Sequence, residues 1–138
     1  MRYLLDTNIF IYAATAKDWL CRDVQAILDD YDNQLYISAE SVKELVHLYR
    51  CKGVCATQWK SATDMVRDIE DNYFITVLPI RKEHLLTYAG LDTPEFHNDP
   101  SDHVIIAQAI TENMPLISSD LKFPFYIQQG LDLVLNKK

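Results

Sequence analysis

The 138 residues are enough for one domain with its own hydrophobic core, and we expect a single domain over residues 1–138. The composition is 49% hydrophobic and 24% charged with three glycines and five prolines, which excludes a disordered, collagen-like or low-complexity chain. The formal net charge of −7 argues against a coat protein that neutralises phosphates broadly, so a polyanionic ligand would need a bound cation or a local basic patch.

Short apolar runs and helical patterns alternate along the first half of the chain. Arg2–Leu5 is a short apolar segment that predicts a strand, and Asp18–Asp32 carries apolar residues at helical spacing. A second strand is predicted over Leu35–Ile37. Ala39–Lys52 keeps its apolar residues on one helical face and stops at Gly53, which is typical of a helix with a C-terminal glycine.

The second half repeats this alternation. The predicted elements, in chain order, are a helix over Thr57–Asp71, a strand over Phe74–Leu78, helices over Lys82–Ala89 and Ser101–Asn113, and strands over Leu116–Ser118 and Leu131–Leu135. Parallel neighbouring strands need a crossover of a dozen or more residues, which helices supply. The pattern therefore predicts an α/β fold, a three-layer α/β/α sandwich around a mainly parallel sheet.

The cysteines and the hydropathy indicate where the protein works. Cys21, Cys51 and Cys55 are odd in number and form no disulfide framework, which favours a reducing compartment. The longest stretch without a charged residue, residues 7–16, is shorter than the roughly 18 apolar residues of a membrane span. Asp6 interrupts any apolar leader. We expect a cytoplasmic protein that crosses no membrane.

Five acidic residues fall where predicted strands end or helices begin. Asp6 follows the first strand, and Glu44 lies in the first turns of the helix after the second strand. Asp99 and Asp102 open a later helix, and Asp120 follows a late strand. In an open α/β sheet these positions meet at the carboxyl edge, where ligands bind. The sequence therefore predicts that acids distant along the chain converge there.

Three of these acids also have a local structural interpretation. Asp6, or Asn8, would cap the helix after the first strand. Asp99 would cap the later helix, with Pro100 at the first helical position. Asp102 would then stand in the first turn, where a negative charge favours the helix dipole. Taken singly, each of these interpretations is commoner than a catalytic role.

The same is true of the other two acids, but the five together favour a metal site. Ser41 and Glu44 fit a capping box, and Asp120 fits a turn. Five converging carboxylates, however, would raise one another's pKa unless a cation neutralised them. Oxygen ligands without a nearby His or Cys favour Mg²⁺, or Mn²⁺, over zinc. Metal-assisted hydrolysis of a phosphodiester is the chemistry that such a site supports.

Four segments spread over nearly the whole chain resemble, in order and spacing, the motifs of the PIN-domain ribonucleases, and within them the VapC-type toxins of toxin–antitoxin pairs. The segments are 4–8, 38–45, 97–109 and 116–120, the last followed by Phe123 and Tyr126. The resemblance implies a PIN-like fold. It also implies that Asp6, Glu44, Asp102 and Asp120 are catalytic and bind the metal, with Asp99 as an additional ligand or neighbouring acid.

The resemblance further suggests supporting residues, and the sequence departs from the family in two places. Thr7, Asn8 and Ser118 are expected to orient the acids. Many VapC-like sequences have Phe and Arg where this chain has Ser101 and His103. A permanently charged guanidinium group that could bind phosphate is therefore absent from the position of His103.

The function that the resemblance implies is a Mg²⁺-dependent endoribonuclease that cleaves RNA, forms a homodimer and is inhibited by a cognate antitoxin protein. Two alternatives remain at this point. One is a catalytically silent PIN-like module that binds RNA or protein. The other is a phosphate-receiving signalling domain of flavodoxin-like strand order, which would want an acidic pair directly after the first strand and a Lys after a late one.

One further cluster has two interpretations. His47, Cys51 and Cys55 recur every four residues and could contribute zinc ligands. A structural zinc site usually has four ligands, and a free Cys is usually a small buried hydrophobe.

Overall fold

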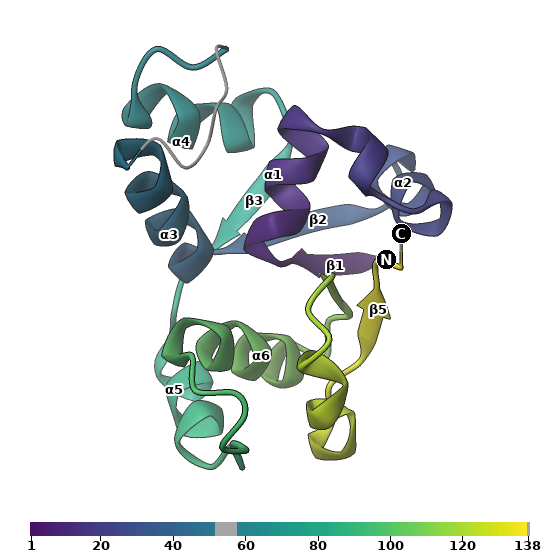
Figure 1. Ribbon diagram of the computed structural model, residues 1–138, viewed down its shortest axis with the longest axis vertical. Helices are drawn as coiled ribbons and strands as arrows, with labels where there is room; N and C mark the ends of the chain where they lie inside the picture. Colours follow the sequence, from purple (N-terminus) through teal and green to yellow (C-terminus); the bar gives the residue numbers. More distant parts are fainter. Residues whose placement is uncertain (52–57, 138) are drawn as a thin grey trace.

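The computed structural model describes residues 1–51 and 58–137 (Figure 1). The strands are β1 (Arg2–Leu5), β2 (Gln34–Ser38), β3 (Ile75–Leu78), β4 (Leu116–Ser118) and β5 (Leu133–Leu135). The α-helices are α1 (Thr7–Thr15), α2 (Arg22–Asp29), α3 (Ala39–Arg50), α4 (Ala62–Asp71), α5 (Lys82–Ala89) and α6 (Pro100–Glu112). Two 3₁₀ helices are η1 (Lys17–Trp19) and η2 (Phe123–Gln129).

The five strands form one parallel sheet in the order β3-β2-β1-β4-β5. At the centre, Leu5 of β1 is in register with Ile37 of β2 on one side and Ile117 of β4 on the other. The carboxyl ends of these three strands therefore lie together at one edge. The order differs from the 2-1-3-4-5 order of flavodoxin-like domains, which argues against the alternative of a signalling domain with that order.

Each face of the sheet has its own hydrophobic core, because successive strand residues point to opposite faces. Leu5 packs in a core with the buried residues of α1, α2, α3 and α4. Leu4, the next residue back, packs in a second core with those of α6 and η2. In Figure 1, α1, α3 and α4 lie on one side of the sheet and α5 and α6 on the other. The predicted three-layer α/β/α architecture is confirmed.

Two predicted helices are shorter than the apolar spacing suggests. The helix expected over Asp18–Asp32 is only α2: its expected start lies in η1, and at its end the Asp30 carboxylate accepts a hydrogen bond from the backbone N–H of Asp32 and turns the chain. The helix expected over Thr57–Asp71 begins at Ala62, where the Ser61 hydroxyl caps it. Trp59 fits the apolar spacing of the expected helix but packs in the core from the turn before α4.

Among the described residues, none of the helices has the length and apolar character needed to span a bilayer.

Candidate metal and catalytic site

The structure brings the five acids predicted from the sequence to the carboxyl edge of the sheet. Asp6 directly follows β1, and Asp120 lies two residues beyond β4. Glu44 projects from α3, and Asp99 and Asp102 stand at the start of α6. Burial raises the pKa values of Asp6, Glu44 and Asp102, and the charges of neighbouring acids in the cluster raise them further. Acidic side chains from segments more than 100 residues apart therefore share one site.

Asp6 is buried and both of its carboxylate oxygens are held by neighbours. Oδ1 accepts a hydrogen bond from the backbone N–H of Thr7 at 2.8 Å, which is the helix cap expected for α1. Oδ2 accepts from the Ser118 hydroxyl at 2.7 Å. Burial raises the pKa of Asp6, and the charges of Asp120 and Asp99 raise it further, while the two hydrogen bonds partly oppose the shift. Asp6 thus caps a helix and faces the acidic cluster.

Glu44 is not the capping partner that the sequence suggested. The cap of α3 is Ser38, whose Oγ accepts from the backbone N–H of Glu40, and Ser41 is buried with no hydrogen-bond partner for its hydroxyl among the described residues. Glu44 instead accepts a hydrogen bond from the Thr7 hydroxyl at 3.2 Å. Burial first, and then the neighbouring acids, raise the pKa of Glu44 to about 7.

Asp99 and Asp102 share the first turn of α6 but have different environments. The Oδ1 atom of Asp99 accepts from the backbone N–H groups of Ser101 and Asp102, at 3.1 and 3.3 Å, with Pro100 at the first helical position. The predicted helix cap is therefore present. Asp102 is more buried, and burial together with the charges of Asp6, Asp99 and Asp120 raises its pKa to about 8.

Asp120 also makes the turn expected of it. Its Oδ1 accepts from the backbone N–H of Lys122 at 2.9 Å, and its own N–H donates to the Ser118 hydroxyl at 3.0 Å. Since Ser118 donates in turn to Asp6, this serine connects the two strand-end acids. Thr7 connects Asp6 to Glu44, because its backbone N–H donates to Asp6 and its hydroxyl donates to Glu44. Asn8, the third residue expected to orient the acids, is exposed and hydrogen bonds through its side chain to no other described residue.

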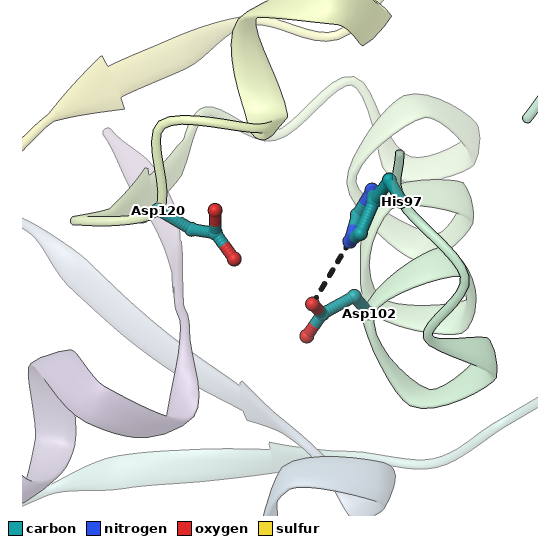
Figure 2. A group of neighbouring side chains, drawn as sticks. All are labelled: His97, Asp102 and Asp120. Atoms are coloured by element: carbon teal, nitrogen blue, oxygen red, sulfur yellow. Dashed lines mark hydrogen bonds and ion pairs between the residues drawn. The ribbon is translucent and has the colours of Figure 1, made fainter. Parts of the chain in front are cut away.

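A histidine lies in this cluster, contrary to the expectation of oxygen ligands without a nearby His. The ligand atoms of His97, Asp102 and Asp120 all lie within 4.8 Å of one another. Figure 2 shows the Asp102 and Asp120 carboxyl groups pointing into the same gap, with the imidazole at its border. His97 stands five residues before Asp102, inside the segment 97–109 that resembles a family motif. This resemblance is what could have identified His97 from the sequence. Its proximity to Asp120 depends on the tertiary fold.

The imidazole of His97 is buried between polar partners. Nε2 lies 3.0 Å from Oδ2 of Asp102, and Nδ1 lies 2.7 Å from the Tyr126 hydroxyl. Burial lowers the pKa of His97, although the charges of nearby acids oppose this. Burial thus favours the neutral form of the imidazole beside the acids.

The two departures from the family pattern make internal contacts. The Ser101 hydroxyl donates to Oε1 of Glu40 at 2.9 Å, and Lys43 is 3.1 Å from the same oxygen. His103 is buried, its Nε2 is 3.0 Å from the carbonyl oxygen of His97, and burial lowers its pKa. His103 thus supports the loop that carries His97, with no permanent charge at this position.

The possible zinc ligands remain incomplete. Nε2 of His47 lies 3.8 Å from Sγ of Cys51, and Cys55 lies outside the described residues. Two described side chains are fewer than the four ligands of a structural zinc site.

The donor set around Asp102 and Asp120 fits a divalent cation. Oδ2 of Asp120 accepts no hydrogen bond from any described residue, and the carboxyl groups of Asp102 and Asp120 point into the same gap (Figure 2). A cation bound there would neutralise the charges that raise the pKa of Asp102. Carboxylate oxygens of this kind suit hard cations.

Comparison with known proteins gives one family and several similar structures. The PIN domain family model matches residues 3–126. VapBC2 from Rickettsia felis, bound to a promoter DNA fragment, is 19% identical with a TM-score of 0.69 over 99% of this chain and 100% of that chain. VapBC-1 from nontypeable Haemophilus influenzae is 24% identical with a TM-score of 0.64 over 100% of both chains. DNA-bound VapBC from Salmonella typhimurium is 16% identical with a TM-score of 0.69 over 99% of both chains. No curated protein sequence matches the chain.

Proposed function

Because the chain belongs to the PIN domain family, we propose that it is a divalent-metal-dependent endoribonuclease and the toxin of a type II toxin–antitoxin pair. The observation that carries the proposal is the pair of facing carboxyl groups, Asp102 and Asp120, inside a cluster of five acids. A folded protein keeps such a repulsive arrangement at a cost in stability, which a bound cation would offset.

The acids have separate tasks in this proposal. Asp102 and Asp120 bind the metal, and Asp6, Glu44 and Asp99 surround it. Bound Mg²⁺ or Mn²⁺ would activate a water molecule and neutralise charge on the scissile phosphate. Thr7 and Ser118 hold Asp6 in place with the hydrogen bonds described above. Glu44, with a pKa of about 7, can accept or release a proton at its carboxylate near neutral pH.

Two basic side chains in a hollow next to the acids are consistent with the proposed RNA substrate, because they suit a phosphate-bearing ligand. A hollow of about 570 Å³ lies beside α3, and Glu44 lines it together with Lys43, His47 and Arg50. Lys43 and Arg50 would offer positive charge to substrate phosphates on a protein whose overall charge is negative.

The proposed partners are a cognate antitoxin protein and a second copy of this chain, in the cytoplasm. The similar structures are of VapBC toxin–antitoxin proteins, which supports an antitoxin partner here. Several large apolar side chains are exposed, among them Leu86 at 65%, Phe96 at 59% and Leu121 at 81%, and protein partners would remove such surface from water.

The proposal is tested by incubating purified protein with RNA and Mg²⁺, with and without a chelator, beside the Asp120→Asn variant. We expect cleavage by the wild-type protein with Mg²⁺ alone, and none with the chelator or by the variant. Circular dichroism checks that the variant is folded. RNA binding without cleavage under every condition would instead favour the silent binding module.

A further inference from the structure

A chain of three polar side chains extends from the acidic cluster into the core. Asp102 of α6 contacts His97 of the preceding loop, and His97 contacts Tyr126 of η2. His97 is 1% exposed and Tyr126 is fully buried, whereas the Asp102 side chain is 17% exposed. These contacts therefore connect the Asp102 carboxyl group at the site to the Tyr126 hydroxyl group, which solvent does not reach.

The hydroxyl of Tyr126 determines which imidazole nitrogen carries the proton. In the described part of the protein, Nδ1 of His97, at 2.7 Å, is the hydrogen-bond partner of this hydroxyl. If Nδ1 carried a proton, it would donate to the hydroxyl oxygen and leave the buried hydroxyl hydrogen without an acceptor, which is costly. Tyr126 therefore donates to Nδ1, and the imidazole proton is on Nε2. That N–H points at Oδ2 of Asp102.

The ring of His97 is held in this orientation on several sides. The backbone carbonyl of His97 accepts a hydrogen bond from Nε2 of His103 at 3.0 Å. The ring centroids of His103, Tyr126 and Phe123 lie 4.8, 5.5 and 5.7 Å from its own. A buried ring packed in this way cannot change rotamer without displacing its neighbours.

We propose that His97 is a positioning residue: its Nε2–H holds Oδ2 of Asp102 and so fixes the Asp102 carboxyl group beside the gap that it shares with Asp120 (Figure 2), and Tyr126 sets the tautomer that makes this possible. The inference rests on the proposed nuclease function. It assigns His97 a place beside the metal ligands rather than among them, because a protonated Nε2 has no lone pair for a metal. A hydrogen bond that orients a ligating carboxylate typically changes metal affinity or activity 10–100-fold.

Three variants separate positioning from metal ligation. His97→Gln places an amide N–H near the position of Nε2 and is a poor metal ligand. His97→Leu removes the donor and keeps an apolar side chain of similar size. Tyr126→Phe removes only the hydroxyl. For each variant, kcat and KM for RNA cleavage are measured at saturating Mg²⁺, Mn²⁺ affinity is measured by calorimetry without RNA, and a thermal melt is recorded.

The protein contains a matched control in His84. Its Nδ1 also accepts a hydrogen bond, from the Arg81 backbone N–H at 2.9 Å, and its Nε2 lies 2.8 Å from Glu112. His84 is fully buried like His97. Glu112 is ten residues along α6 from Asp102, about 15 Å at 1.5 Å per residue. His84→Leu therefore removes an equivalent buried histidine–carboxylate pair far from the acids.

We expect His97→Leu to lower kcat about 10- to 100-fold with KM changed less than about threefold. His97→Gln should recover kcat to within about threefold of wild type, Tyr126→Phe should fall between them, and His84→Leu should lower the melting temperature without changing kcat. Equal defects in His97→Gln and His97→Leu, with Mn²⁺ affinity lost in both, would make His97 a ligand and overturn the inference. Wild-type kcat in His97→Leu would also overturn it.

Failure of the inference can be told from failure of the proposed function. If wild-type protein binds Mn²⁺ but cleaves no RNA, the proposed function fails, and the Mn²⁺ affinities still compare His97→Gln with His97→Leu. If His97→Leu does not fold, Tyr126→Phe and His97→Gln decide the matter. Unchanged kcat and Mn²⁺ affinity in Tyr126→Phe would then contradict the role assigned to the hydroxyl.

Discussion

Replacing Asp102 by asparagine should stabilise the metal-free protein while it abolishes RNA cleavage. The carboxyl group of Asp102 lies among other acids, and burial and their charges raise its pKa from 3.8 to about 8. The folded protein therefore binds the Asp102 proton more tightly than the unfolded chain does. Stability that depends on this proton is fully present below about pH 4 and is lost as the pH rises towards 8. An asparagine has no proton to lose, and its amide oxygen can still accept the hydrogen bond from His97.

The size of the effect follows from the pKa shift. At pH 7 the unfolded Asp102 is about three pH units above its ordinary pKa, and each unit corresponds to about 1.36 kcal/mol, which gives a ceiling of about 4 kcal/mol. The side chain is 17% exposed and solvent screens part of the repulsion, so we expect a gain of about 1–3 kcal/mol in the free energy of unfolding. For a chain of this length that is a rise in melting temperature of at least about 3 °C.

The assay is a thermal melt in the presence of a chelator at pH 4, 6 and 8, with RNA cleavage measured in parallel. Asp132→Asn is the matched control, since Asp132 is exposed just before β5 and its side chain hydrogen bonds to no other described residue. We expect the Asp102→Asn gain to be near zero at pH 4 and largest at pH 8, and the control to change little. A variant less stable than wild type at pH 8, or a gain equal at all three pH values, would refute the crowded-acid explanation.

Three other substitutions test single contacts. Ser118→Ala leaves Oδ2 of Asp6 without its hydroxyl donor, so we expect a loss of about 1–3 kcal/mol in chemical denaturation together with reduced cleavage; an unchanged protein would show that Ser118 does not hold Asp6. Asp99→Ala removes a helix cap and should cost about 1 kcal/mol, whereas Asp99→Ser keeps a capping oxygen and should cost less; equal losses would show that the cap is not what stabilises α6. Ser41→Ala removes a buried, unpartnered hydroxyl from α3 and should stabilise the protein by up to about 1 kcal/mol, a sign that urea unfolding checks directly.

The parts of the fold that repeat periodically could be predicted from the sequence. Lys82–Ala89 forms α5 with the predicted bounds, and the sheet has the predicted parallel character. The predicted helix boundaries were wrong where side chains outside the periodic pattern determine them, as Asp30 does at the end of α2 and Ser61 at the start of α4. Trp59 fitted the helical spacing but reaches the core from a turn, where its indole N–H donates to Asp68 at 2.8 Å.

The parts of the site that follow from the topology of a parallel sheet could be predicted from the sequence. Acids that follow strands or open helices must approach the same edge, and Asp6 and Asp120 do so although 114 residues separate them. The capping box at Ser41 was wrong because α3 begins directly after β2, which makes Ser38 the cap. The position of His97 could not be predicted, because its partner Tyr126 is 29 residues away and is brought to it by the packing of η2.

The central claim is that carboxylates from separate strands and helices bind a divalent cation at one edge of the sheet. It is tested most directly by a crystal structure of the protein with Mn²⁺, in which anomalous scattering locates the ion. We expect an anomalous peak between Asp102 and Asp120, within bonding distance of an oxygen of each and separated from Nε2 of His97 by the carboxyl group of Asp102. A crystal at saturating Mn²⁺ with no peak between these two carboxylates would contradict the claim.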